Sequence, residues 1–279
     1  MEYNHLLGAL LSLLSALSWA TNDIFNKLAL KRGYEENFVL WIRFPLGAIL
    51  LLPLGLLYWD LNKKVILTTF LWLPTEVIAS ILFIKAIKHS PLSVAMPFFA
   101  FMPLFSALVG WLVLGESLSP HGILGILLII FGSILLSGTD LKGFFKVNRG
   151  ALYALLSAAL FGLNVVIGKI AVVSSNQFFF AWYYCVVMSL GLLPFVKEFQ
   201  PPKVIIKEKL FPVIGVLFSL GMVFYTWAYL YTYASYVAAL ERLAILLDIL
   251  YGKIFFKEEI RYALWASIFM VFGAILLSL

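Results

Sequence analysis

Acidic side chains lie inside segments of the chain that are otherwise apolar. Asp23 follows Asn22 in one such segment and Glu76 lies in another, and Glu76 has no basic residue one helical turn away. A carboxylate at the centre of a bilayer costs about 2.5 kcal/mol or more, so an unpaired one is protonated, hydrated or bound to a cation. Glu76 is therefore the first candidate for proton coupling or cation recognition. The alternatives are an interhelical hydrogen bond and a position nearer the headgroups.

A second charged group lies close to the C-terminus. Glu241 and Asp248 are seven residues apart and would share one face of a helix, whereas Arg242 would be turned about 100° from Glu241. One acid is expected to pair with Arg242 or with a lysine of another helix, which leaves the other acid freer. The group is either a structural ion network or part of a substrate site.

Aromatic residues could complete a site for an amine. Tyr225 and Tyr229 are one turn apart, and Trp19 lies in the segment that carries Asn22. With Glu76 or Glu241 they could form a cage in which each desolvated cation-π contact contributes about 2 kcal/mol. Tryptophan and tyrosine are also expected at membrane interfaces, which is the alternative for most of the aromatic residues.

The first apolar segment carries a polar stripe, which consists of Ser12, Ser15, Trp19, Asn22 and Asn26. Spacings of 3 and 4 put these residues on one face of a helix, and in lipid such a face must contact protein or water. A later segment has the corresponding stripe Ala154, Ser157, Phe161, Asn164 and Gly168. Asn22 and Asn164 either face each other across a cavity and bind substrate, or hold packed helices together.

The chain is internally duplicated. The stretch Gly8–Ala29 recurs 142 positions later as Gly150–Ala171, and the LLP of Leu51–Pro53 recurs as Leu192–Pro194. The sequence FGSILLS at 131–137 recurs as FGAILLS at 272–278. These matches indicate a repeated unit.

The composition is that of an integral membrane protein. Hydrophobic residues make up 63% of the 279 residues and charged residues 12%, which excludes a water-soluble globule. About ten spans of roughly 20 residues fit this length. They are expected at 6–30, 38–58, 66–87, 92–113, 120–137, 150–172, 177–196, 211–232, 235–256 and 261–279. The net charge of +6 comes from loop residues typical of membrane flanks, which argues against nucleic acid as a partner.

Five spans per repeat decide the topology. An odd number returns the chain on the opposite side of the membrane, so the second copy must be inverted relative to the first. The sequence therefore predicts an all-α integral membrane protein of ten transmembrane helices, built as two inverted five-helix repeats over residues 1–139 and 150–279.

Four features resemble the drug/metabolite transporter superfamily, in its ten-helix branch of two EamA-type domains. They are LWIRF with Arg43, the Ser90–Pro91 link into a helix with Pro97 and Pro103, the LGE at 114–116, and the FGSILLS ending. The resemblance implies a central cavity lined mainly by the first, third and fourth helices of each half, with the fifth helices outside. Arg43, Lys27 and Lys169 fall at recurring basic positions of the family, for which we favour a structural or snorkelling role.

The resulting hypothesis is a secondary transporter of the cell membrane for a small organic metabolite. An amino acid or amine is favoured, with proton coupling through Glu76 or Asp23. His5, His89 and His121 form no ligand spacing with Cys185 or with carboxylates, so neither an enzyme, a metal site nor a cofactor is expected. The alternatives are a choline-like quaternary ammonium transporter and a non-transporting scaffold or receptor. The expected partners are the substrate and the lipid bilayer, and the chain could act as a monomer or a homodimer.

The orientation of the termini stays open. Most basic loop residues, such as Lys31, Lys88 and the group from Lys197 to Lys209, lie in odd-numbered loops, while Lys63 and Lys64 lie in an even-numbered one. The positive-inside rule then places both termini outside. The family resemblance implies termini in the cytoplasm.

Overall fold

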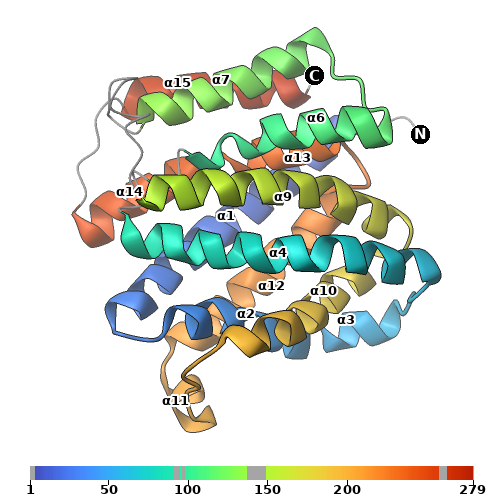
Figure 1. Ribbon diagram of the computed structural model, residues 1–279. Coiled ribbons are helices and arrows are strands. Elements are labelled where there is room, and N and C mark those ends of the chain that lie inside the picture. The colour runs from blue at the N-terminus through green and yellow to red at the C-terminus, as the bar shows by residue number, and fades with distance from the viewer. Residues whose placement is uncertain (1–3, 91–94, 96–97, 137–148, 258–262, 279) are drawn as a thin grey trace.

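Helices form all the regular structure in the residues that the computed structural model describes, which are 4–90, 95, 98–136, 149–257 and 263–278 (Figure 1). The first half contains α1 (His5–Lys31), α2 (Glu36–Leu50), α3 (Leu52–Leu57), α4 (Lys63–His89), α6 (Met102–Leu114) and α7 (Pro120–Leu136). The second half contains α9 (Arg149–Val173), α10 (Gln177–Leu192), η1 (Leu193–Phe195), α11 (Pro202–Lys207), α12 (Leu210–Ala228), α13 (Ala234–Glu241), α14 (Ala244–Phe256) and α15 (Ala263–Ser278). Each predicted span coincides in its described part with one of these helices or with two consecutive ones.

The second span of each half is bent where the LLP sequence recurs. α2 ends before Leu51 and α3 begins at Leu52, while α10 ends at Leu192 and is followed by η1. Each new helix has a proline in its first two positions, where the missing N–H is not needed. The repeated sequence therefore marks a repeated break, and the expected continuous spans 38–58 and 177–196 are corrected.

The ninth span is also broken, because a turn at Arg242 and Leu243 separates α13 from α14. In the first half a turn at Ala100 and Phe101 precedes α6, 142 positions earlier. Helices interrupted at corresponding positions of two repeats are typical of transporter sites near the bilayer midplane. Pro91 and Pro97 lie outside the described residues, whereas Pro103 lies in the first turn of α6.

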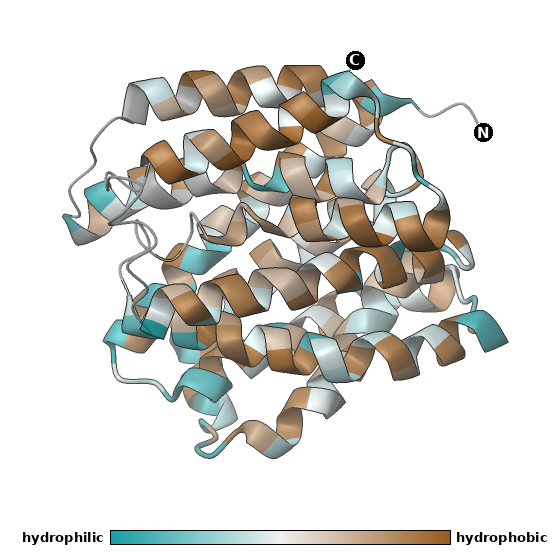
Figure 2. Cartoon of the chain, turned by 45° about the horizontal axis from the view of Figure 1, so that its top comes forward, coloured by the Kyte–Doolittle hydropathy of each residue, from teal (hydrophilic) through white to brown (hydrophobic). Residues whose placement is uncertain are grey.

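The outside of the bundle is apolar, as a lipid environment requires. Large side chains such as Leu10, Leu17, Phe70 and Leu108 are exposed, and Figure 2 shows most helical surface in the hydrophobic colour. Four helices of the described chain are long and apolar enough to cross a membrane by length and composition, at 63–89, 149–173, 177–195 and 210–228. The N- and C-terminal ends lie at the same end of the bundle in Figure 1.

The first predicted span of each half packs along the third predicted span of the other half, so that α1 lies on α12 and α9 lies on α4. The hydroxyl of Ser15 donates to the carbonyl of Gly221 at 3.1 Å, and that of Ser157 donates to the carbonyl of Ala79 at 2.8 Å. Both partners of the second bond lie 142 positions from their counterparts in the first. The polar stripes thus face protein, and the two halves are interleaved.

The fifth helices, α7 and α15, pack on each other along one side of the bundle (Figure 1). A Cβ at Gly132 would lie 2.8 Å from the carbonyl oxygen of Ala266, and one at Gly273 would lie 2.6 Å from that of Gly125. Because backbone approaches backbone at both positions, only glycine fits. These are the glycines of the recurring FGSILLS and FGAILLS sequences.

A larger residue at this contact should destabilise the bundle. Gly132→Leu is expected to lower Tm by roughly 5 °C, because the carbonyl of Ala266 cannot move away as a flexible side chain could. Leu127→Met is the matched control on the exposed face of the same helix, and should change Tm by less than about 1 °C. Thermal unfolding of the detergent-purified protein measures both. Equal Tm values for wild type and Gly132→Leu would contradict the packing.

Candidate functional site

A cavity lies between the two halves, with an empty volume of about 1220 Å³ when the open space at its mouth is included. Its wall comes from α1, α4, α6, α9, α12, α13 and α14, and also from α2 and α10. All of the residues proposed from sequence line it: Trp19, Asn22, Asp23, Glu76, Asn164, Tyr225, Tyr229, Glu241 and Arg242. Their role in substrate binding stays a prediction.

Glu76 connects the two halves. It projects from α4 and accepts hydrogen bonds from the Asn164 amide of α9, at 2.6 Å, and from the Tyr184 hydroxyl of α10. Trp72, one turn earlier on α4, stacks on the Tyr184 ring with centroids 5.3 Å apart. The Glu76 side chain is buried, makes interhelical hydrogen bonds and belongs to the cavity wall, and its role in proton coupling or cation recognition stays a prediction.

Tyr184 is a residue that the sequence analysis missed. It lies 141 positions after Arg43, which also lines the cavity. The second helix of each half therefore places one polar side chain in the wall, although the resemblance assigns the wall to the first, third and fourth helices. Applying the repeat offset to Arg43 would have identified Tyr184.

Asn22 and Asn164 are bonded to the opposite half rather than to each other. The Asn22 amide donates to the carbonyl of Ile214 in α12 at 2.7 Å, and its oxygen accepts from Asn26 at 2.8 Å. The oxygen of Asn164 accepts from the Thr75 hydroxyl at 2.7 Å. Both asparagines line the cavity, but the hydrogen bonds shown are those of the helix-packing interpretation.

An aromatic group lies near Glu241. The rings of Trp19 and Tyr225 have centroids 5.0 Å apart, and Tyr225 and Tyr229 are 4.7 Å apart and joined through their hydroxyls. Tyr229 is the C-cap of α12 rather than an interior residue of the predicted span 211–232. Glu241 accepts from Ser15 at 3.1 Å and lies 3.7 Å from Arg242.

The helix break changes the expected geometry of the C-terminal charged group. α13 ends at Glu241 and α14 begins at Ala244, so Glu241 and Asp248, which are seven residues apart, lie on two different helices. The same break lets Arg242 approach its neighbour Glu241 despite the 100° expected for a continuous helix. The side chain of Asp248 lies outside the described residues.

Arg43 lies in the cavity wall, and the structural or snorkelling role favoured for it from sequence stays a prediction. Its side chain is 9% exposed, and its guanidinium carbon is 4.9 Å from the ring centroids of both Phe44 and Phe218. Within the described residues no carboxylate lies within 4.0 Å of it, although the charge of Asp23 acts on it.

Lys169 does have a structural role. Its ammonium donates to the Glu116 carboxylate at 2.7 Å and to the carbonyl of Thr232 at 2.9 Å, and both charged side chains are only 6% exposed. This pair joins the C-terminal end of α6 to α9 and to the turn before α13. Glu116 belongs to the LGE sequence, so that sequence supplies a buried anion for the second half. Lys27 is buried as well.

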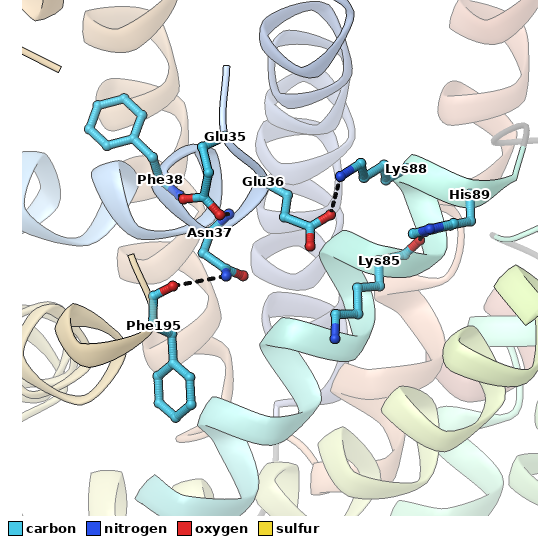
Figure 3. Close-up of polar contacts among 8 residues, drawn as sticks. All are labelled: Glu35, Glu36, Asn37, Phe38, Lys85, Lys88, His89 and Phe195. Atoms are coloured by element: carbon cyan, nitrogen blue, oxygen red, sulfur yellow. Dashed lines mark hydrogen bonds and ion pairs between the residues drawn. The ribbon is translucent and has the colours of Figure 1, made fainter. Parts of the chain in front are cut away.

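A further ion pair, between Lys88 and Glu36, lies at the periphery of the bundle. Figure 3 shows Lys88, at the end of α4, pointing to Glu36 at the start of α2, with 2.7 Å between the charged atoms. Glu35 caps the backbone N–H groups of Asn37 and Phe38, and the Asn37 amide donates to the carbonyl of Phe195 at 2.9 Å. The Lys88 side chain is 49% exposed, so water can solvate this pair.

Comparison with known proteins decides the family. A sequence profile described as the EamA-like transporter family matches residues 6–138 and again 148–279. The chain belongs to the EamA-like transporter family. It is therefore a membrane transporter and not an enzyme, and the predicted relationship to the drug/metabolite transporter superfamily is confirmed.

Relatives agree with this assignment. The chain is 25% identical to an uncharacterized transporter of Archaeoglobus fulgidus over 287 aligned positions, which cover 98% of both chains. It is 30% identical to the uncharacterized transporter YwfM of Bacillus subtilis over 142 positions, 48% of this chain and 47% of that one. A crystal structure with 18% identity superposes with a TM-score of 0.72 over 96% of this chain and 95% of the other, which shows a shared fold.

The Lys169–Glu116 and Lys88–Glu36 ion pairs should contribute differently to the free energy of unfolding. Lys169→Met leaves the buried Glu116 carboxylate with the backbone N–H of Ala234 at 3.4 Å, and should lower the free energy of unfolding by about 3 kcal/mol. Lys169→Met combined with Glu116→Gln should recover part of that loss, because the uncompensated charge is gone. Lys88→Met, the exposed counterpart, should cost less than about 1 kcal/mol. Denaturation of the purified variants tests this, and equal costs for Lys169→Met and Lys88→Met would refute it.

Proposed function

We propose that the protein is a secondary transporter of the cell membrane for a small amine-bearing metabolite, with amino acids favoured over sugar nucleotides. Two inverted five-helix repeats, 1–139 and 150–279, would rock about the cavity between them. The observation that carries the proposal is the position of that cavity, which is walled by both halves and by the two broken helices. Such a wall can open to either side of the membrane while the site stays between the two repeats.

The chemistry of the wall supports an amine on the substrate. Trp19, Tyr225 and Tyr229 form a cluster of rings in the cavity wall, which Glu241 also lines, so a cation could be held by ring quadrupoles and a carboxylate together. Phosphates of a sugar nucleotide would need several free cations. The same aromatic group is what favours the second candidate, transport of a quaternary ammonium compound.

Glu76 is the proposed proton-coupling group, with Asp23 as the alternative. As a carboxylate, Glu76 accepts from two donors of the second half, Asn164 and Tyr184. Protonation turns one acceptor oxygen into a donor, which weakens a bond between the halves. Proton binding and relative motion of the halves would thereby be linked.

A ligand screen tests the substrate class. Amino acids, amines and sugar nucleotides are added to the purified protein, and Tm is measured for each. A ligand that binds only the folded state raises Tm, by an amount that grows with its concentration over Kd. We expect stabilisation by at least one amino acid or amine. Stabilisation by sugar nucleotides alone would contradict the proposal.

Glu76→Gln should abolish accumulation driven by a pH difference in proteoliposomes while preserving exchange of labelled for unlabelled substrate. Glutamine keeps the shape of the side chain and one acceptor oxygen but cannot take up a proton. The substrate is the ligand that the screen identifies, and uptake is followed with and without the pH difference.

Glu36→Gln is the matched control, because Glu36 contacts Lys88 at the periphery and does not line the cavity. This variant should accumulate substrate as the wild type does. Unchanged pH-driven accumulation by Glu76→Gln would remove Glu76 from the coupling step and leave Asp23 as the candidate.

A further inference from the structure

Five ionisable side chains of opposite sign line the cavity: Asp23, Glu76 and Glu241 are acidic, and Arg43 and Arg242 are basic. Three of them already have partners in the wall. Glu76 accepts two hydrogen bonds, and Glu241 accepts one and lies 3.7 Å from Arg242. Among the described residues, Asp23 accepts one long hydrogen bond, and the buried Nε of Arg43 has no hydrogen-bond partner.

Arg43 is a buried cation that makes no ion pair with the described residues. Within the described chain its Nε lies buried without a hydrogen-bond partner. The rings of Phe44 and Phe218 flank the group at 4.9 Å and fix its orientation. Aromatic faces attract a cation, but they accept none of the five N–H bonds that a guanidinium can donate.

Asp23 is an acid with spare acceptor capacity. Its carboxylate accepts a single long hydrogen bond, 3.3 Å from the amide of Asn26 on its own helix. The charges of Arg43 and Arg242 act on it, yet neither guanidinium is within 4.0 Å in the described structure. Asp23 and Arg43 both line the cavity, and the gap between their charged atoms is wider than that of an ion pair.

With a cation on one side and an anion on the other, this gap is complementary to a zwitterion. The fork of a guanidinium matches a carboxylate, with two parallel N–H···O bonds, and a carboxylate accepts from an ammonium group. An α-amino acid carries both groups on one carbon atom. Its insertion would satisfy the open donors of Arg43 and the open acceptors of Asp23 together.

We propose that Arg43 binds the carboxylate and Asp23, in place of Glu241, the ammonium group of a free α-amino acid, whose side chain then extends into the aromatic part of the cavity. The inference rests on the proposed transport function and narrows its substrate class. It counts against a choline-like substrate, because an unpaired guanidinium in the same low-dielectric space repels a ligand that carries only positive charge.

A matched ligand series tests the proposal on the full-length protein. The twenty common amino acids are ranked by thermal shift, and the best one is compared with its decarboxylated amine and its deaminated acid. Binding to wild type is measured by titration calorimetry. We expect the amino acid to bind at least about tenfold more tightly than either analogue, because each analogue leaves one wall charge unpaired.

Two variants separate the two ends of the ligand. Arg43→Gln should weaken binding of the amino acid by at least about tenfold and leave that of the amine unchanged or improved. Asp23→Asn should weaken binding of the amino acid and of the amine but not of the acid. Lys88→Gln, far from the cavity at the periphery, is the control and should bind as wild type does.

Other outcomes overturn the inference. An amine that binds wild type as tightly as the amino acid, or an Arg43→Gln variant that weakens both ligands equally, refutes the role of Arg43. Should Arg43→Gln fail to fold, Arg43→Lys and the wild-type ligand series decide the question. If amines or sugar nucleotides stabilise the protein and amino acids do not, the transport function survives without this inference. If no class stabilises it, both fail.

Discussion

The arrangement depends on one constraint, that a polar helix face inside a membrane must be satisfied by protein. The first helix of each half meets this constraint on the third helix of the other half, through Ser15 with Gly221 and Ser157 with Ala79. The halves are consequently interleaved rather than laid side by side. Because the same helices also carry Asn22, Glu76 and Asn164, this interface brings the polar side chains to the centre of the bundle.

The duplicated scaffold holds two different sets of polar groups. The two equivalent asparagines make different hydrogen bonds. The Asn22 amide donates to the backbone carbonyl of Ile214, whereas the Asn164 amide donates to the carboxylate of Glu76. Equivalent positions on the second helices carry Arg43 in one half and Tyr184 in the other. A symmetric frame with an asymmetric lining suits a ligand whose two ends differ in charge, and its charged end would lie nearer the first half.

Several features of the fold could be predicted because they follow from local physics. The apolar runs predicted the helices, and the Gly132 and Gly273 sequences recur because backbones meet there. The breaks were harder to predict. Proline in the LLP sequence signals a bend, but Arg242 and Leu243 interrupt a helix without proline or glycine, so the packing around them must favour the turn. The break lies between Glu241 and Asp248, and because the side chain of Asp248 lies outside the described residues, the face that they share stays a prediction.

The sequence by itself determined the membrane environment, the duplication, the family and the set of candidate cavity residues. The family follows from the resemblance of short motifs to known transporters, and the rest are properties of composition, periodicity and spacing, which are local or compare the chain with itself. Only the tertiary structure decided which of those residues are already bonded and which are open. Pairing such as that of Glu76 with Asn164 and Tyr184 joins helices far apart in the sequence, and that no described carboxylate pairs with Arg43 depends on every helix packed around it.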